Sequence, residues 1–278
     1  MKKISRRSFM AAAAVSVAAL ALTACGGSAS SAASSVASSA ASSEAVSSAA
    51  AAELTTVEAG KLTMATNAAF PPYEMTTDAG EFEGIDVDTA KAIAEKLGLE
   101  LQIDDMDFDA ALLSVQQGKA DIVMAGVTVT DERKAVMDFS DSYATGIQSI
   151  IVPNDSDIAS PDDLAGKKIG TQRGTTGYIY CSDDFGDENV VAYDDGLTAV
   201  QALNNGQVDA VVIDNAPAQE FVAANPGLKV LDTSYAEEDY AIGVAKGSAL
   251  EDAVNKALEE LKADGTLQAI VDKYINAN

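Results

Sequence analysis

The chain of 278 residues contains no histidine and no tryptophan, and it has only two cysteines. A nucleophilic cysteine normally needs an activating base, and histidine is the usual one. Cys181 lies in an apolar run, where a small, half-buried hydrophobic residue is the simplest interpretation. We therefore expect no covalent chemistry, no metal site and no cofactor.

Basic residues are also scarce, with 18 Lys and Arg against 43 Asp and Glu and a formal net charge of −25. A chain with this charge repels phosphate backbones, which excludes nucleic acid as a partner. The acidic residues are interpreted as solvated surface, which keeps an exported protein soluble.

Long apolar runs are absent except near the start of the chain. Basic residues at positions 2, 3, 6 and 7 precede an apolar stretch over 9–22, which is too short to span a membrane comfortably. The stretch ends at Leu22-Thr23-Ala24-Cys25, which looks like a bacterial lipobox. We predict a lipoprotein signal peptide over residues 1–24 and a lipid on Cys25, which leaves no intrachain disulfide possible. The alternative is an ordinary secretory signal with a chance cysteine.

Residues 28–52 are almost entirely serine and alanine. They offer no apolar face to bury, so we predict a flexible tether within residues 25–58. A coil of this length would reach roughly 25–30 Å. The protein is thus expected to be exported and anchored to the outer face of the bacterial cell membrane. The paired arginines leave the general and the twin-arginine export routes both open.

From residue 61 onward, short β-type runs alternate with runs of helical periodicity. We predict strands over 61–65, 99–103, 122–125, 168–171, 208–213 and 228–231, and helices over 88–97, 108–117, 251–263 and 267–275. This alternation indicates an α/β fold with mainly parallel sheets flanked by helices.

Two segments of this region resemble each other. Residues 116–125 and 204–213 each read as a helix end, a glycine stop, an aspartate and a buried strand. The offset of about 88 residues is the size of a small α/β lobe, so we predict two lobes of similar construction. A chance recurrence of helix–glycine–strand order is the alternative.

The ends of the two matched strands carry opposite charges. Arg133 follows the first strand and Asp214 ends the second, and ligands bind beyond the carboxyl ends of parallel strands. If the lobes face each other, the cleft would hold a carboxylate at Arg133, beside the helix that Thr130 caps, and an ammonium at Asp214. An α-amino acid carries both groups. The alternatives are a surface ion pair of Arg133 with Asp138 or Asp141, and a helix N-cap at Asp214.

Several motifs together resemble a known family. Residues 65–74 (ATNAAFPPYE), 84–88 (GIDVD), 126–133 (GVTVTDER) and 138–140 (DFS) look like the polar amino-acid substrate-binding proteins of ABC importers, the family 3 solute-binding proteins. The similarity runs from about residue 60 to the end of the chain. It implies a two-lobed, hinged periplasmic-binding-protein fold of the second type.

The resemblance also assigns candidate ligand-binding residues. It implies that Arg133 binds the ligand α-carboxylate with help from Thr128, that the backbone at Gly126 and the carboxylate of Asp214 receive the ammonium, and that Thr175 and Thr176 present N–H groups from the second lobe. Phe70 and Phe108 would contact the ligand side chain, with core packing as the alternative for both rings, whereas core packing is the favoured explanation for Tyr73. The alternative for Gly126 is a strand-end turn.

Asn67 is the informative departure from the family pattern. Several relatives that take basic amino acids, and some that take glutamine, carry an acid here, and an amide supplies no counter-charge. Asn67 therefore favours a neutral polar ligand, such as glutamine or a sulfur amino acid. Glu74, or Asp107 beside Phe108, leaves a basic ligand open.

By this resemblance the chain is a monomeric binding protein, not an enzyme, that captures a free L-amino acid and delivers it to a membrane permease. Lobe 1 would comprise residues 59–146 and 241–278, and lobe 2 residues 147–240. The lobes would close about hinges near 145–147 and 240–243. The alternatives are an enzyme on the same fold, like the cyclohexadienyl or arogenate dehydratases, and a ligand-sensing lipoprotein without import.

Overall fold

The computed structural model describes residues 54–275. The predicted signal peptide, Cys25 and nearly all of the predicted tether lie outside this range. Among the described residues, no helix combines the length and the apolar character needed to cross a membrane.

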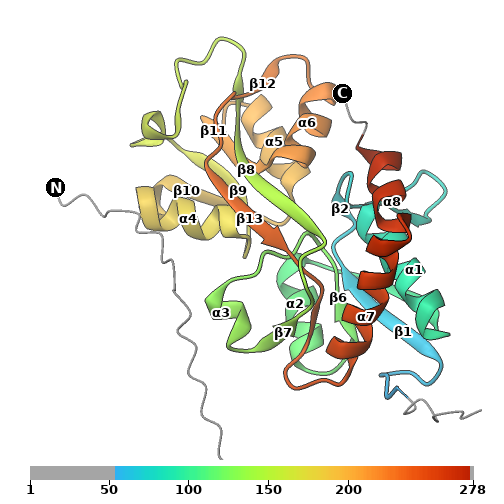
Figure 1. The fold of residues 1–278 in the computed structure, drawn as a ribbon. Coiled ribbons are helices and arrows are strands. Elements are labelled where there is room, and N and C mark those ends of the chain that lie inside the picture. The colour runs from blue at the N-terminus through green and yellow to red at the C-terminus, as the bar shows by residue number, and fades with distance from the viewer. Residues whose placement is uncertain (1–53, 276–278) are drawn as a thin grey trace, which may run out of the picture. The chain divides into compact units, whose positions relative to one another are not determined.

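The first sheet has the strand order β5-β1-β6-β14-β7 (Figure 1). Its strands are β1 (Lys61–Thr66), β5 (Glu100–Asp105), β6 (Ile122–Val123), β7 (Met137–Phe139) and β14 (Gly243–Ala245). β1 pairs in parallel with β5 and β6, whereas β14 is antiparallel to both of its neighbours. One strand therefore runs against the other four.

The second sheet has the order β10-β9-β11-β8-β12, and β13 pairs with β8. Its strands are β8 (Ala144–Pro153), β9 (Ile169–Gln172), β10 (Val190–Tyr193), β11 (Ala210–Asp214), β12 (Leu228–Val230) and β13 (Ala236–Tyr240). β9 pairs in parallel with β10 and β11, and β8 is antiparallel to β11, β12 and β13. The strand order and directions repeat those of the first sheet, with β6 and β11 in matching places.

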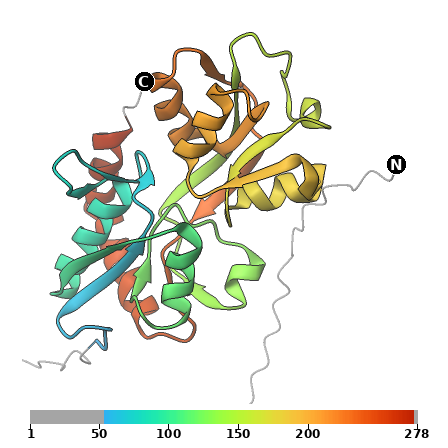
Figure 2. The same ribbon diagram turned by 180° about the vertical axis from the view of Figure 1, so that it is seen from behind.

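Helices cover both faces of each sheet, as Figures 1 and 2 show. The helices of the first sheet are α1 (Ile85–Leu97), α2 (Phe108–Gln116), α7 (Leu250–Ala263) and α8 (Thr266–Tyr274). α1, α7 and α8 pack together on one side, whereas α2 packs against β1, β6 and β14. The second sheet carries α4 (Thr176–Phe185), α5 (Gly196–Asn204) and α6 (Asn215–Ala224). The fold is therefore α/β, as the sequence predicts.

Alternation along the strands divides the core into layers. On β11, Ala210 and Val212 belong to the cluster that includes Cys181 of α4, whereas Val211 and Ile213 face the cluster that includes residues of α5 and α6. Cys181 is fully buried rather than half-buried, because it lies on the sheet-facing side of α4.

The remaining elements are short. β2 (Ala69–Phe70), β3 (Glu74–Thr76) and β4 (Phe82–Glu83) form a small antiparallel sheet, α3 (Asp131–Lys134) is one turn, and 3-10 turns span Pro161–Leu164 and Asp187–Asn189.

Predicted and observed elements agree to within about three residues at their ends. The largest difference is α1, which begins at Ile85 rather than Asp88. The first turn of α1 contains two acids, Asp86 and Asp88, which in sequence read as exposed residues outside the apolar helical pattern. Asp86 is nevertheless buried and belongs to the helix. β6 is two residues long, shorter than the predicted strand over 122–125, because the chain turns away at Gly126.

Candidate functional site

Thr130 begins α3 by capping it, since its hydroxyl accepts a hydrogen bond from the Arg133 N–H at 3.2 Å. The helix comprises only four residues. A single turn has little macrodipole, so any anion site here depends on the guanidinium of Arg133 and not on the helix end.

The Arg133 side chain is buried with 8% exposure. Its Nη1 donates to the Thr128 carbonyl oxygen at 2.8 Å and its Nη2 to the Gly174 carbonyl oxygen at 3.1 Å, while its Cζ lies 5.3 Å from the centroid of the Phe108 ring. Burial lowers the pKa of the guanidinium, and Glu238 opposes this effect; arginine nevertheless stays charged. Because a guanidinium has five N–H donors, Arg133 keeps donors for a further acceptor.

The surface ion pair considered for Arg133 does not form. Asp138 pairs instead with Lys246 and accepts the Gly247 N–H. Lys246 is exposed, so this pair lies at the surface, away from the buried guanidinium.

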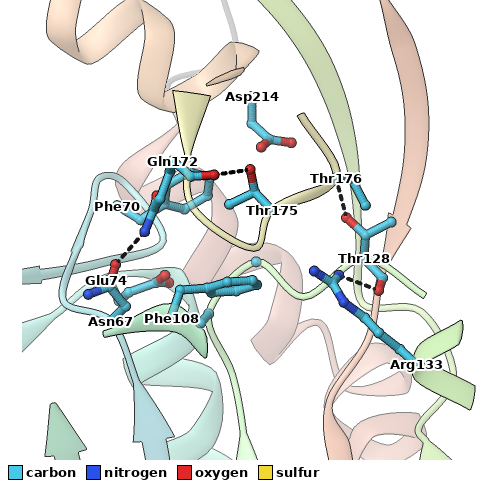
Figure 3. A pocket seen from close by; sticks show the side chains of 12 residues that line it. Asn67, Phe70, Glu74, Phe108, Thr128, Arg133, Gln172, Thr175, Thr176 and Asp214 are labelled. Atoms are coloured by element: carbon cyan, nitrogen blue, oxygen red, sulfur yellow. Dashed lines mark hydrogen bonds between the residues drawn. The ribbon is translucent and has the colours of Figure 1, made fainter. Parts of the chain in front are cut away.

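All nine residues proposed as ligand contacts line one cavity between the two sheets (Figure 3). The lining consists of Asn67, Phe70, Glu74, Phe108, Ala125, Gly126, Thr128, Arg133, Gln172, Thr175, Thr176 and Asp214. The cavity measures about 20 Å³, enough for a water molecule. The structure therefore has the cleft closed on itself, and an amino acid would enter only if the walls part.

The second sheet contributes the turn between β9 and α4. Thr175 caps α4, because its Oγ1 accepts the Tyr178 N–H at 3.3 Å while donating to the Gln172 carbonyl oxygen at 2.8 Å. Thr176 is buried, and its Oγ1 lies 3.4 Å from the Thr128 Oγ1 of the opposite wall. The two hydroxyls thus meet across the cavity.

Asp214 ends β11 and is 7% exposed. It occupies the N-cap position of α6, but its side chain makes no capping bond. Instead, Oδ2 accepts from the Gln148 Nε2 at 2.9 Å and Oδ1 accepts from the Tyr240 hydroxyl. Burial raises the pKa of Asp214 to about 7, against the opposing effect of these two hydrogen bonds.

A second buried acid lies behind Arg133. The Oε2 of Glu238 accepts from the Thr128 hydroxyl at 3.2 Å and from the same Gln148 Nε2 at 2.9 Å. Gln148, on β8, therefore donates to two buried carboxylates at once. It connects the proposed carboxylate and ammonium ends of the cavity.

Gly126 has a backbone requirement of its own. Its φ of 55° lies in the left-handed region, and a Cβ would come 2.9 Å from Cε1 of Phe70. Its N–H donates to the Asp86 Oδ2 at 3.0 Å. The turn after β6 thus explains the glycine whether or not a ligand approaches it.

Asn67 bridges the two walls. Its Nδ2 donates to the Met106 carbonyl oxygen at 3.0 Å, and its Oδ1 accepts from the Gln172 Nε2 at 2.9 Å. Both ends of the amide are therefore engaged by the protein. The absence of an acid at position 67 consequently decides less about the ligand than the sequence suggested.

Glu74 is the acid that the sequence left as an alternative. It is fully buried at the start of β3, and neither oxygen finds a hydrogen-bond donor among the described residues. Burial, followed by the charge of Asp86, raises the pKa of Glu74 well above its ordinary range. Figure 3 shows it beside Asn67, away from the end occupied by Thr128 and Arg133.

Sequence reasoning did not select Gln172 and Ala125 of the lining, nor the supporting residues Asp86, Gln148 and Glu238. One signal was available for Asp86. It precedes Ala90 and Ile93 at helical spacing, so it falls on the apolar side of α1, and an acid on such a side is unusual. Gln148 and Glu238 carry no such signal, because their burial depends on the pairing of β8 with β13.

The aromatic candidates divide between the cavity and the core. Phe70 and Phe108 line the cavity and are also packed in core clusters, so both interpretations hold. Tyr73 is outside the lining and stacks on Phe70 and edge-on to Tyr240. Asp107 is not in the lining either. Within residues 54–275, no group of three or more Cys, Asp or Glu side chains is arranged to hold a metal ion.

The chain is similar to a known protein family over most of its length. The model of the bacterial extracellular solute-binding proteins, family 3, matches residues 62–277. This range includes every element of both sheets that the structure describes, apart from the first residue of β1.

Individual relatives agree with this match. The L-cystine-binding protein TcyJ of Escherichia coli K12 is 33% identical over 225 residues, which cover 80% of this chain and 85% of that protein. A probable histidine-binding protein of Neisseria gonorrhoeae is 34% identical over 272 residues, covering 95% and 94%. The solved structure of the arginine-, lysine-, histidine-binding protein ArtJ from Geobacillus stearothermophilus superimposes with a TM-score of 0.75 at 34% identity, covering 78% and 96%.

Proposed function

The chain belongs to the bacterial extracellular solute-binding proteins of family 3, and we propose that it binds a free L-amino acid with a cationic side chain for an ABC importer. The observation that carries the choice of ligand is the charge of the cavity. Its lining has two buried acids, Glu74 and Asp214, and one buried cation, Arg133. An amino acid with a cationic side chain supplies one carboxylate and two cations, which balances this set.

The backbone of the ligand would bind at the end of the cavity formed by Arg133 and Asp214. The free donors of Arg133 suit a carboxylate, and the Thr175–Thr176 turn offers N–H groups from the other wall. Asp214 would take the α-ammonium, and an ammonium near it would lower its pKa and keep it ionised. These roles are proposals supported by the placement of the residues.

The side chain of the ligand would extend toward Glu74, with Phe70 and Phe108 beside it. A buried carboxylate without a donor is costly, and a guanidinium or ammonium is the partner that removes the cost. ArtJ, named for arginine, lysine and histidine, and the histidine-binding relative support this choice. We therefore favour a basic ligand over the neutral one that Asn67 suggested.

Binding would proceed by closure of two lobes, 59–146 with 241–278 and 147–240. Contacts between the walls of the two sheets include Arg133 with Gly174, Asn67 with Gln172, and Thr128 with Thr176. These contacts would break when the lobes part, and the walls would close again on the ligand, which would bias closure by contacting both of them. The hinges would lie near 145–147 and 240–243, where β8 begins and β13 ends.

The setting of the protein is proposed from its family and its first residues. Removal of residues 1–24 and lipidation of Cys25 would anchor a monomer to the outer face of the cell membrane through the tether ending near residue 58. From there it would deliver ligand to the permease subunits. The family and the relatives are binding proteins, and we propose no catalysis for this chain.

A thermal-shift screen of the purified protein tests this function. The twenty amino acids, ornithine and cystine would each be added at 1 mM. We expect arginine, lysine or ornithine to give the largest increase in melting temperature, since a ligand at 100 times its Kd stabilises the folded state by about 2.7 kcal/mol. A shift only with glutamine or cystine would refute the cationic ligand, and no shift with any amino acid would refute the function.

A further inference from the structure

Two carboxyl groups are buried side by side next to the cavity. Glu74, on β3, and Asp86, on α1, are both 0% exposed. The Oδ2 of Asp86 accepts the Gly126 N–H at 3.0 Å and the Tyr143 hydroxyl at 2.8 Å. Its Oδ1 and both oxygens of Glu74 have no donor among the described residues. The two donors therefore favour a negative charge on Asp86, whereas no donor among these residues is left to stabilise a charge on Glu74.

The surroundings of Glu74 are entirely acidic or neutral. The titratable groups that face it are Asp86 from α1, Asp105 from β5, Asp214 from β11, and the phenols of Tyr73 and Tyr143. Within residues 54–275, neither Glu74 nor Asp86 has a lysine or arginine as an ion-pair partner. Two like charges this close cannot both persist without a cation.

Protonation resolves this conflict in the absence of a cation. With a proton, Glu74 becomes a hydrogen-bond donor, and Asp86 is the acceptor beside it. Burial and the neighbouring acids raise the pKa of Glu74 well above its ordinary range, and burial raises the pKa of Asp86 to about 6. Asp86 keeps the charge, because it accepts two hydrogen bonds and Glu74 accepts none from the described residues.

We propose that the Glu74–Asp86 pair holds one proton in the ligand-free protein and releases it to solvent when the cationic side chain of a ligand binds beside Glu74. This inference rests on the proposed function. The protonated carboxyl of Glu74 loses its proton to solvent, and the resulting carboxylate pairs with the cationic side chain of the ligand. One free proton is formed for each such pair, so charge and protons balance. Selection of a basic amino acid is thereby coupled to deprotonation of the protein.

The composition of the chain makes this proton easy to observe. With no histidine present, side chains with ordinary pKa values do not titrate between about pH 5.5 and 7.5. Asp86 of the proposed pair has a pKa of about 6, and Asp214 also titrates in this range, with a pKa of about 7. Because Asp214 would face the α-ammonium of any amino acid, its proton is released with neutral and cationic ligands alike. The proton from Glu74 is the difference between them.

Isothermal titration calorimetry of the full chain at pH 6.5 tests the proposal. Arginine and its neutral analogue citrulline would each be titrated in phosphate and in Bis-Tris, which both buffer at this pH and whose ionisation enthalpies differ. The dependence of the observed enthalpy on the buffer gives the number of protons released. We expect arginine to release about one proton more than citrulline, and its affinity to rise up to about tenfold more per pH unit than that of citrulline.

Variants identify the source of the proton. In Glu74→Gln, the proton release with arginine should fall to the citrulline value and the affinity for arginine should fall at least about a hundredfold. Glu83→Gln, an exposed acid on β4 of the same small sheet, is the matched control and should release the same protons as the parent.

The outcomes separate the two proposals. Arginine binding with no more proton release than citrulline would overturn the proton coupling and leave the proposed function standing, and this comparison needs no variant. Excess release that persists in Glu74→Gln would also overturn it. Absence of heat with every amino acid would refute the proposed function itself.

Discussion

At the scale of single residues, Arg133 decides most about the candidate site. A cation in the first turn of a helix is unfavourable in the sequence pattern. The structure explains it by burial, since Arg133 contacts two backbone carbonyls and the face of Phe108. The helix is a single turn with little macrodipole to oppose the cation, and it serves to place the side chain.

Replacement of Arg133 with alanine should lower the affinity for the amino-acid ligand by at least about a hundredfold. The ligand carboxylate would be left buried and unpaired, which costs about 3–5 kcal/mol. Arg173→Ala is the control, because Arg173 is exposed and its one ion-pair partner within residues 54–275 is Asp194, at 3.5 Å. Calorimetry with the ligand from the thermal-shift screen would measure both. Unchanged binding by Arg133→Ala would contradict the assignment.

Gln148 is a positioning residue whose removal has a specific signature. Gln148→Leu would remove the donor that Asp214 and Glu238 share. Because this donor stabilises the ionised form, the pKa of Asp214 would rise further, and ligand affinity would fall by about tenfold near neutral pH. The loss of affinity on acidification should then begin at a higher pH than in the parent. The measurement is Kd from pH 5 to 8, with the exposed Gln219→Leu as control. An equal loss at every pH would indicate only a structural defect.

At the scale of elements, β8 and β13 form the antiparallel pair that connects the second sheet to the first. Tyr240, at the end of β13, is fully buried and donates to Asp214. Its ring lies so close to Gly146 that a Cβ there would come within 2.5–2.6 Å of it. The absence of a side chain at Gly146 therefore leaves room between β8 and β13 for the Tyr240 ring, whose hydroxyl donates to Asp214.

Gly146→Ala should consequently destabilise the protein and weaken binding together. Overpacking against a buried ring costs typically about 1–3 kcal/mol, and displacement of Tyr240 removes a donor from Asp214. Gly227→Ala provides the comparison, since an added Cβ there meets nothing within 4 Å. Urea unfolding and calorimetry would report the two effects. Full stability and affinity in Gly146→Ala would show that the ring can move freely.

At the scale of the whole molecule, the buried acids link stability to pH. Glu74, Asp86 and Asp214 all have pKa values raised above their ordinary ones, with Asp86 near 6 and Asp214 near 7. The native state then binds more protons than the unfolded state, so stability falls as pH rises from about 4 toward 7. Each group contributes at most about 1.4 kcal/mol per pH unit within its own window.

We therefore expect the melting temperature of the ligand-free protein to fall between pH 5 and 7. A saturating basic ligand should remove the decline, because it lowers the pKa values of Glu74 and Asp214. Glu74→Gln should melt higher than the parent at pH 7 and at nearly the same temperature at pH 4, since it lacks the carboxyl that folding must protonate. Scanning calorimetry across this range, with Glu83→Gln as control, measures the effect. A melting temperature independent of pH would contradict it.

The sequence determined the alternation of strands and helices, the repeated lobe pattern and the grouping of nine residues from Asn67 to Asp214 around one cavity. These features depend on local periodicity, on glycine stops and on the rule that strand ends converge, all of which are readable along the chain.

Only the tertiary structure decided that Glu74 and Asp86 are buried together, that Asn67 is engaged by Gln172, and that Gln148 joins Asp214 to Glu238. An acid after Tyr73 looks like a surface residue, because most acids are exposed. Its burial arises from segments far apart in sequence packing around it. The pKa of a carboxyl depends on that packing, so the cationic ligand that we propose could not be derived from the order of residues alone.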